Sequence, residues 1–144
     1  MVHAVNPVSI FLPVLAIVGL TLLGFLRMAA ARGAAVKAGQ DPAFYRCYQG
    51  SPEPEPAIIA ARHWGNLFEA PVLFYAGCIS AYALGAVTVW TLAFAWSFAV
   101  MRVLQSAVHL TGNAPTWRGL FFSLAVFSAF ALWGDLALAI LARM

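Results

Sequence analysis

The chain has 144 residues, of which 63% are hydrophobic and only 9% are charged, and its mean hydropathy is +0.86. About a quarter of the residues in a soluble domain are charged, so this composition excludes an ordinary soluble domain and indicates an integral membrane protein. The net charge of +3 comes from a few short stretches and does not indicate nucleic-acid binding.

Four apolar segments are each long enough to cross a bilayer as a helix, which takes about 20 residues. The sequence predicts these helices at about 7–31, 57–83, 87–110 and 118–142, within a single domain over residues 1–144. The runs lack the period-two alternation of a membrane β-barrel. Proline residues inside the first two segments, Pro13 and Pro71, are compatible with unbroken helices where neighbouring helices satisfy the freed carbonyl groups.

The N-terminus and the first loop have distinct compositions. Residues 1–6 contain no Lys or Arg, so the basic region of a cleavable signal peptide is missing and the first segment is interpreted as a retained helix. The first loop, about 32–56, ends in alternating prolines over 51–56, which exclude a helix there and favour an extended connector.

Lys and Arg residues gather around the first and third loops rather than at the chain ends. They are Arg27, Arg32, Lys37, Arg46, Arg102 and Arg118. Because cytoplasmic loops are enriched in basic residues, we expect these loops in the cytoplasm and both termini outside.

Three polar residues of the second predicted helix form one stripe: Arg62, Asn66 and Glu69. Offsets of four and seven residues return to nearly the same helical face. Such groups cannot be solvated by hydrocarbon, so they must face protein or a ligand. One alternative is purely structural, with an internal Arg62–Glu69 pair and Asn66 bonding to another helix.

A second stripe follows on the third predicted helix, at offsets that again share one face: Arg102, Gln105 or Ser106, His109 and Asn113. Arg118 opens the fourth helix after a short loop. Two arginine-bearing stripes at one depth favour a cationic pocket for a carboxylate or phosphate group over structural pairing alone.

The other ionisable residues indicate less. His63 and His109 stand on different helices with no evident third ligand, so neither a metal nor a haem site is expected. Cys47 and Cys78 belong to different environments and predict no disulfide. Asp135 is either a proton-relay carboxylate or, as we prefer, a hydrated or paired acid near a helix end.

The pattern Arg62-x-x-x-Asn66-x-x-Glu69, in the second of four helices, resembles the signature of the MAPEG family, the membrane-associated proteins in eicosanoid and glutathione metabolism. That family includes microsomal glutathione transferases and the leukotriene and prostaglandin E synthases. The length, the outside termini and the longer first loop are similar too. The segment from Arg102 to Arg118 also resembles the family's third helix and following loop.

The resemblance implies an all-α bundle of four transmembrane helices that forms a homotrimer, here as a bacterial-type member in the inner membrane with periplasmic termini. A bundle this thin also favours oligomers. Glutathione, the co-substrate, would lie between neighbouring subunits near the cytoplasmic face, and a hydrophobic small-molecule electrophile would arrive from the membrane lipids. The implied glutathione-binding residues are Arg27, Arg62, Asn66, Glu69, Arg102, Gln105 and His109. Arg118 is the implied catalytic residue, because a guanidinium favours the thiolate.

The chain departs from the family where tyrosines are usual, because Ala70 follows the motif glutamate and the third helix carries Gln105 and His109. Two functions therefore stay open. The preferred one is a glutathione-dependent transferase or peroxidase, and the other is a non-catalytic lipid-binding or scaffold protein of the same fold. A small transporter or channel is disfavoured, since neither inverted repeats nor broken helices are detectable.

Overall fold

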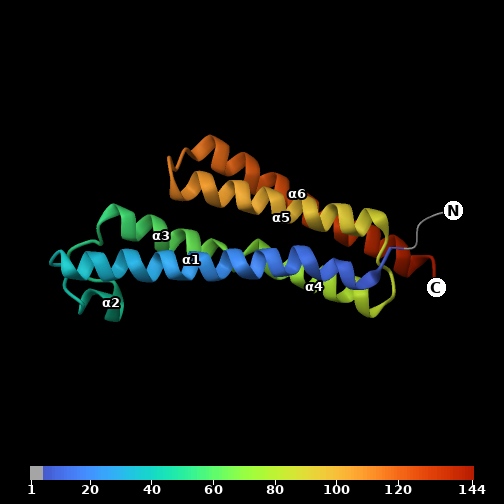
Figure 1. The fold of residues 1–144 in the computed structure, drawn as a ribbon, viewed down its shortest axis with the longest axis horizontal. Helices are drawn as coiled ribbons and strands as arrows, with labels where there is room; N and C mark the ends of the chain where they lie inside the picture. Colours follow the sequence, from blue (N-terminus) through green and yellow to red (C-terminus); the bar gives the residue numbers. More distant parts are fainter. Residues whose placement is uncertain (1–4) are drawn as a thin grey trace.

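The computed structural model describes residues 5–144, and its elements are helices joined by short connections (Figure 1). In chain order they are η1 (Pro7–Ile10), α1 (Phe11–Lys37), α2 (Phe44–Cys47), α3 (Glu55–Asn66), α4 (Ala70–Ala83), α5 (Val89–Leu110) and α6 (Pro115–Leu141). The start of η1 and the end of α6 lie at one end of the molecule (Figure 1). Residues 1–4, on which the signal-peptide argument partly depends, lie outside the described residues.

The first helix is longer than predicted and the first loop correspondingly shorter. α1 ends at Lys37, and Gly39 follows with a φ of +106°, a conformation open to glycine. The amide of Gln40 then donates to the carbonyl of Ala35 at 3.0 Å, which satisfies one of the last carbonyl groups of the helix. The loop therefore covers residues 38–54 and not 32–56.

The loop itself is only partly extended. It contains the short helix α2, which ends where Tyr48 adopts a φ of 56°. Residues 51–54 are non-helical, as the alternating prolines predicted. Pro56 instead lies in the first turn of α3, where a missing N–H leaves no helical hydrogen bond unmade.

The second predicted helix, 57–83, is not continuous, and this prediction was wrong. α3 ends at Asn66 and α4 starts after a turn, because Pro71 cannot donate to the carbonyl of Leu67 and its ring crowds that carbonyl. Pro13, in contrast, is accommodated close to the start of α1. The chain does therefore contain a broken helix.

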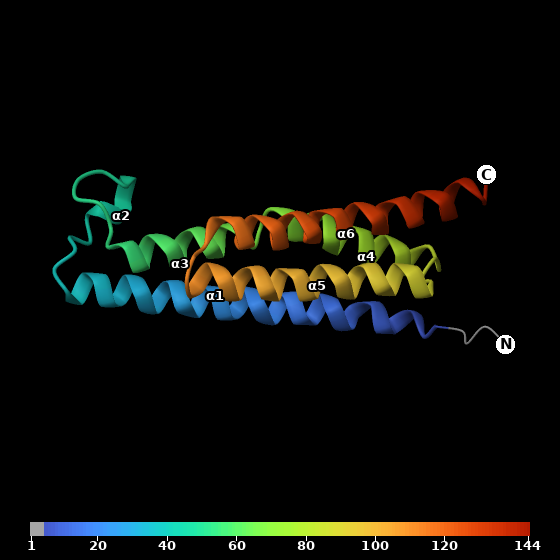
Figure 2. The same ribbon diagram turned by 90° about the horizontal axis from the view of Figure 1, so that it is seen from above.

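Within residues 5–144, three helical segments are long and apolar enough to span a membrane: Pro7–Lys37, Val89–Leu110 and Pro115–Leu141. α3 and α4 have 12 and 14 residues, fewer than the roughly 20 that one crossing takes. They follow one another alongside α1 (Figures 1 and 2), so a fourth crossing would have to be made by the pair.

The core lies where the α5–α6 hairpin packs on α1 and α4. Phe74 of α4 stacks on Phe98 of α5 with ring centroids 4.3 Å apart, and the hydroxyl groups of Ser97 and Ser128 join α5 to α6 at 2.9 Å. In Figure 1 the α5–α6 pair separates from α1 and α3 toward the end that carries the 38–54 loop. At this end α1 and α3 pack on one another through a small apolar cluster of Met28, Ala31, Ala35, Ala57 and Ala60. The contacts between α3 and α5 are polar.

The 38–54 loop is fastened to α1 by an ion pair between Arg32 Nε and Glu53 Oε1 at 2.9 Å. Glu53 is buried, and the Arg32 guanidinium also lies over the ring of Tyr45 at 5.0 Å. Glu53→Gln keeps the shape but removes the charge, which we expect to weaken this attachment by about 1 kcal/mol. Limited proteolysis in detergent should then cut the loop about five times faster, since cleavage follows local opening.

Glu55→Gln is the matched control, because Glu55 is exposed and forms no ion pair within the part of the chain that the structure describes. Equal cleavage of the two variants would show that the Arg32–Glu53 pair does not hold the loop.

Candidate functional site

The break between α3 and α4 exposes polar groups that a continuous helix would have used. Asn66 is the last residue of α3 and Glu69 precedes the first turn of α4. Asn66 Nδ2 donates to Glu69 Oε2 at 2.9 Å. The backbone carbonyl of Asn66, which would accept from residue 70 in an unbroken helix, instead accepts from Arg102 Nη2 at 2.9 Å.

The polar stripe of α5 is buried against this break. Arg102 is fully buried, and its Nη1 also donates to Asn66 Oδ1 at 3.0 Å. Gln105 and Ser106, the two alternatives at the next position, are 1% and 3% exposed, so both are buried. The stripe of the second predicted helix, in contrast, is not buried by one copy of the chain, as we expected for so thin a bundle: Arg62 and Glu69 are exposed and Asn66 is half-buried.

The start of α6 supplies the opposite wall. Pro115 occupies the first turn of the helix, where its fixed φ suits the backbone. Asn113 lies just before it with a φ of 45°, and its Oδ1 accepts from Arg118 Nη1 at 2.6 Å. The side chain of Arg118 is therefore held by the short α5–α6 connection that brings it toward α3.

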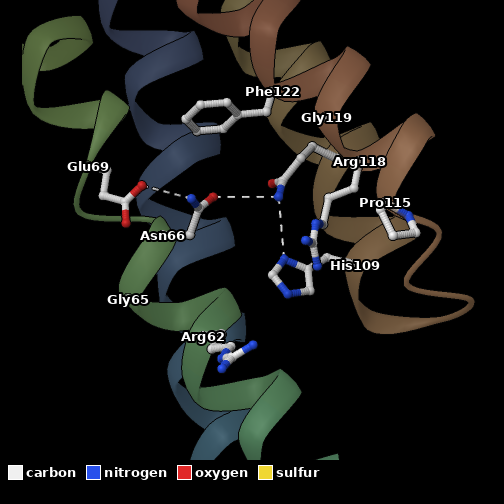
Figure 3. A pocket seen from close by; sticks show the side chains of 10 residues that line it. Arg62, Gly65, Asn66, Glu69, His109, Pro115, Arg118, Gly119 and Phe122 are labelled. Carbon is white, nitrogen blue, oxygen red and sulfur yellow. Dashed lines mark hydrogen bonds between the residues drawn. The ribbon is translucent and has the colours of Figure 1, made fainter.

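Together these elements enclose a cavity of about 550 Å³ between α3, α5 and α6, the α3–α6 pocket (Figure 3). It is lined by Arg62, Gly65, Asn66, Glu69, Gln105, His109, Pro115, Arg118, Gly119 and Phe122. Its volume falls in the range of about 300–1000 Å³ that is typical of small-molecule sites.

The pocket has more positive than negative charge. Arg62 and Arg118 line it from α3 and α6, and Glu69 is its one carboxylate. Among the described residues Arg62 and Glu69 form no ion pair, so the structural alternative of an internal Arg62–Glu69 pair is not what the structure contains. Both groups are exposed and free to meet a ligand. The arrangement suits a molecule that carries several anionic groups and at least one cationic group.

A family model described as the MAPEG family matches residues 10–138, nearly the whole chain. The chain belongs to the MAPEG family. No curated protein and no solved structure matches it. MAPEG membership and three helices able to span a bilayer establish an integral membrane protein with a helical bundle, and indicate a glutathione-related function.

Six of the residues that the MAPEG resemblance implied line the α3–α6 pocket: Arg62, Asn66, Glu69, Gln105, His109 and Arg118. Two do not. Arg102 lies behind the pocket wall, where it donates to Asn66 and lies over the ring of Phe122 at 5.5 Å. Arg27 is exposed on α1 and lines a separate cleft of about 250 Å³ with Glu55 and Thr111.

Four lining residues of the α3–α6 pocket were not predicted: Gly65, Pro115, Gly119 and Phe122. A signal was present, because the last three and Arg118 recur at the helical offsets of three, four and seven. The two glycines have open space where a Cβ atom would stand, so side chains there would project into unfilled volume.

Asp135 belongs to the opposite end of α6 from the pocket. Its Oδ2 accepts from the hydroxyl groups of Thr91 at 2.6 Å and Thr88 at 3.2 Å. The same threonines form the capping box of α5, so the carboxylate fastens α6 to the start of α5. Of the two interpretations of Asp135, a proton-relay carboxylate or a hydrated or paired acid, the structure contains the paired acid.

Proposed function

We propose that this MAPEG protein binds glutathione in the α3–α6 pocket and acts as a glutathione-dependent transferase or peroxidase on lipophilic electrophiles. The observation that carries the proposal is the charge pattern. Glutathione with an ionised thiol has three anionic groups, two carboxylates and the sulfur, and one ammonium. Two guanidinium groups, of Arg62 and Arg118, and one carboxylate, of Glu69, line the pocket, and Arg102 adds a third positive charge behind Asn66.

The roles follow from position. Arg62 is exposed and suits a glutathione carboxylate, while Glu69, held by the Asn66 amide, suits the ammonium group. Arg118 is the proposed catalytic residue, since its guanidinium stabilises the sulfur in its charged form. In the transferase step the thiolate uses a lone pair to form a carbon–sulfur bond with the electrophile, and the displaced electron pair leaves with the leaving group.

The apolar second substrate would arrive through the bilayer. α5 carries an apolar groove of about 160 Å³ on another face, lined by Ala16, Trp96, Ala99, Val100, Val103 and Leu104. Much of this groove is exposed in the single chain, including Trp96 and Val100. In the bilayer this groove faces lipid, so a lipophilic molecule dissolved in the membrane can reach it without passing through water.

The homotrimer in a bacterial inner membrane remains part of the proposal. Arg27 lies outside the pocket of its own chain, so it can contact glutathione only across a subunit boundary. The end of α1 and the short helix α2, which carry Arg32, Lys37 and Arg46, lie at the end of the molecule nearer α3, and the start of η1 and the end of α6 lie at the other end (Figure 2). This arrangement supports a cytoplasmic pocket and periplasmic termini.

The test is glutathione binding and conjugation by the purified protein. We expect saturable binding by calorimetry and glutathione-dependent conjugation of a lipophilic aryl halide. Arg62→Ala should weaken binding about tenfold or more, because a hydrogen bond to a charged group is worth about 1.5–3 kcal/mol. Arg46→Ala, in the exposed loop helix α2, is the control and should bind as the parent does. Absence of binding to the parent, or equal affinities of the two variants, would refute the proposal.

A non-catalytic lipid-binding protein is the second candidate, favoured by the apolar α5 groove and by Ala70, Gln105 and His109 where tyrosines are usual. It predicts lipid that copurifies with the protein and exchanges in vesicles. It also predicts no turnover of any electrophile even where glutathione binds.

A further inference from the structure

The hydrogen bonds around Asn66 allow only one arrangement of donors and acceptors. The guanidinium of Arg102 can only donate. The Asn66 side-chain atom that it meets at 3.0 Å must therefore be the oxygen, which turns Nδ2 toward the Glu69 carboxylate at 2.9 Å. The amide orientation of Asn66 is thus fixed from both sides, by a cation that donates and an anion that accepts.

Gln105 links the fixed amide of Asn66 to His109 through its own side-chain amide. Its Nε2 lies 3.5 Å from Asn66 Oδ1 and 3.4 Å from His109 Nδ1. Because Asn66 Oδ1 is an acceptor, Gln105 presents its NH₂ group there, and an amide nitrogen cannot accept. The second N–H of that group therefore meets a lone pair on His109 Nδ1. The imidazole is neutral, and its single proton is on Nε2.

No other described group competes for Nδ1 of His109. His63 packs edge-on against the ring, with centroids 5.3 Å apart, and neither ring nitrogen of His63 has a hydrogen-bond partner within residues 5–144. The charged or titratable groups that face His109 are Arg62 and His63 from α3, Arg102 from α5 and Arg118 from α6. Figure 3 shows His109 beside Arg118 and across the pocket from Asn66.

We propose that His109 is a further catalytic residue, whose Nε2–H donates a hydrogen bond to the sulfur anion of the bound thiol. This rests on the proposed glutathione chemistry. On ionisation the S–H bond breaks, sulfur keeps both electrons and the proton leaves to water at the open side of the pocket. His109 neither gains nor loses a proton. Arg118 supplies the charge, and His109 supplies the directional donor.

Three variants test this inference by the ultraviolet absorbance of the bound thiolate as a function of pH. His109→Gln places an amide N–H near the position of Nε2, His109→Asn places one only near Nδ1, and His109→Phe has none. We expect the parent and His109→Gln to titrate alike. In His109→Asn and His109→Phe the pKa of the bound thiol should rise by about one unit. At pH values well below the parent's thiol pKa, the fraction of thiolate is then about tenfold smaller.

Binding of S-methylglutathione, which has no ionisable thiol, controls for damage to the pocket and should be within about threefold of the parent in all variants. If the parent binds neither glutathione nor its S-methyl analogue, the proposed function falls and this inference falls with it. If the parent binds both and His109→Phe titrates as the parent does, only the inference is wrong. Should His109→Phe fail to fold, equal thiol pKa values in His109→Gln and His109→Asn overturn it.

Discussion

Arg102→Met is expected to weaken glutathione binding more than tenfold, although Arg102 does not line the pocket. The guanidinium satisfies the Asn66 backbone carbonyl at the helix break and also orients the Asn66 amide. Methionine fills much of the volume but donates nothing, so two part-buried acceptors of Asn66 lose this donor at about 1–3 kcal/mol each. We expect the free energy of unfolding in mixed micelles to fall by about 2–6 kcal/mol. Affinity for glutathione, measured by calorimetry, should fall more than tenfold.

Two further variants distinguish the loss of the Arg102–Asn66 hydrogen bonds from a non-specific effect of replacing an arginine. Arg102→Lys keeps the charge but cannot bridge both Asn66 acceptors in the planar geometry of a guanidinium, so its affinity should lie between those of the parent and Arg102→Met. Arg46→Met removes an exposed arginine whose side chain forms no hydrogen bond or ion pair within residues 5–144. It should change neither the free energy of unfolding nor the affinity for glutathione. A stable Arg102→Met protein with parental affinity would show that Asn66 orients itself without Arg102.

Helical spacing alone predicted which side chains would share a wall. Asn66 and Glu69 on one segment and Gln105 and His109 on another do line a common pocket. For Gln105 and His109 this is a local consequence of the 3.6-residue period of α5. Glu69 lies beyond the end of α3, and it is the hydrogen bond from Asn66 Nδ2 that ties it to Asn66. Pro115, Gly119 and Phe122 are spaced just as regularly. Their spacing could not be used, because most neighbouring residues of this helix are also apolar.

The break after Asn66 was not predictable in the same way. A proline inside a membrane helix can either kink the helix or end it, because neighbouring groups decide whether the freed carbonyls are satisfied. Here the satisfying group is Arg102, 36 residues further along the chain. Spacing could show that Arg102 faced inward, but not that it would bind a backbone carbonyl rather than a ligand.

The second large effect is expected from Arg118→Ala, which should slow conjugation far more than it weakens glutathione binding. An adjacent cation lowers the pKa of an acid by about one to three units. Without it the pKa of the bound thiol rises, and turnover at neutral pH should fall about 10- to 1000-fold. Within residues 5–144, Asn113 Oδ1 accepts from one nitrogen of the guanidinium at 2.6 Å, and the other two nitrogens have no protein partner and can meet the sulfur. Steady-state kinetics with calorimetry on the same preparation makes the comparison.

The pH dependence identifies the cause of that loss. A raised thiol pKa removes thiolate at pH values below it, so the deficit of Arg118→Ala should be largest at low pH and should shrink as the pH rises past the new pKa. Arg118→Lys restores a positive charge near the same place and should recover part of the rate without restoring the bond to Asn113. A deficit that is constant across pH would mean that Arg118 positions the substrate and does not ionise the thiol.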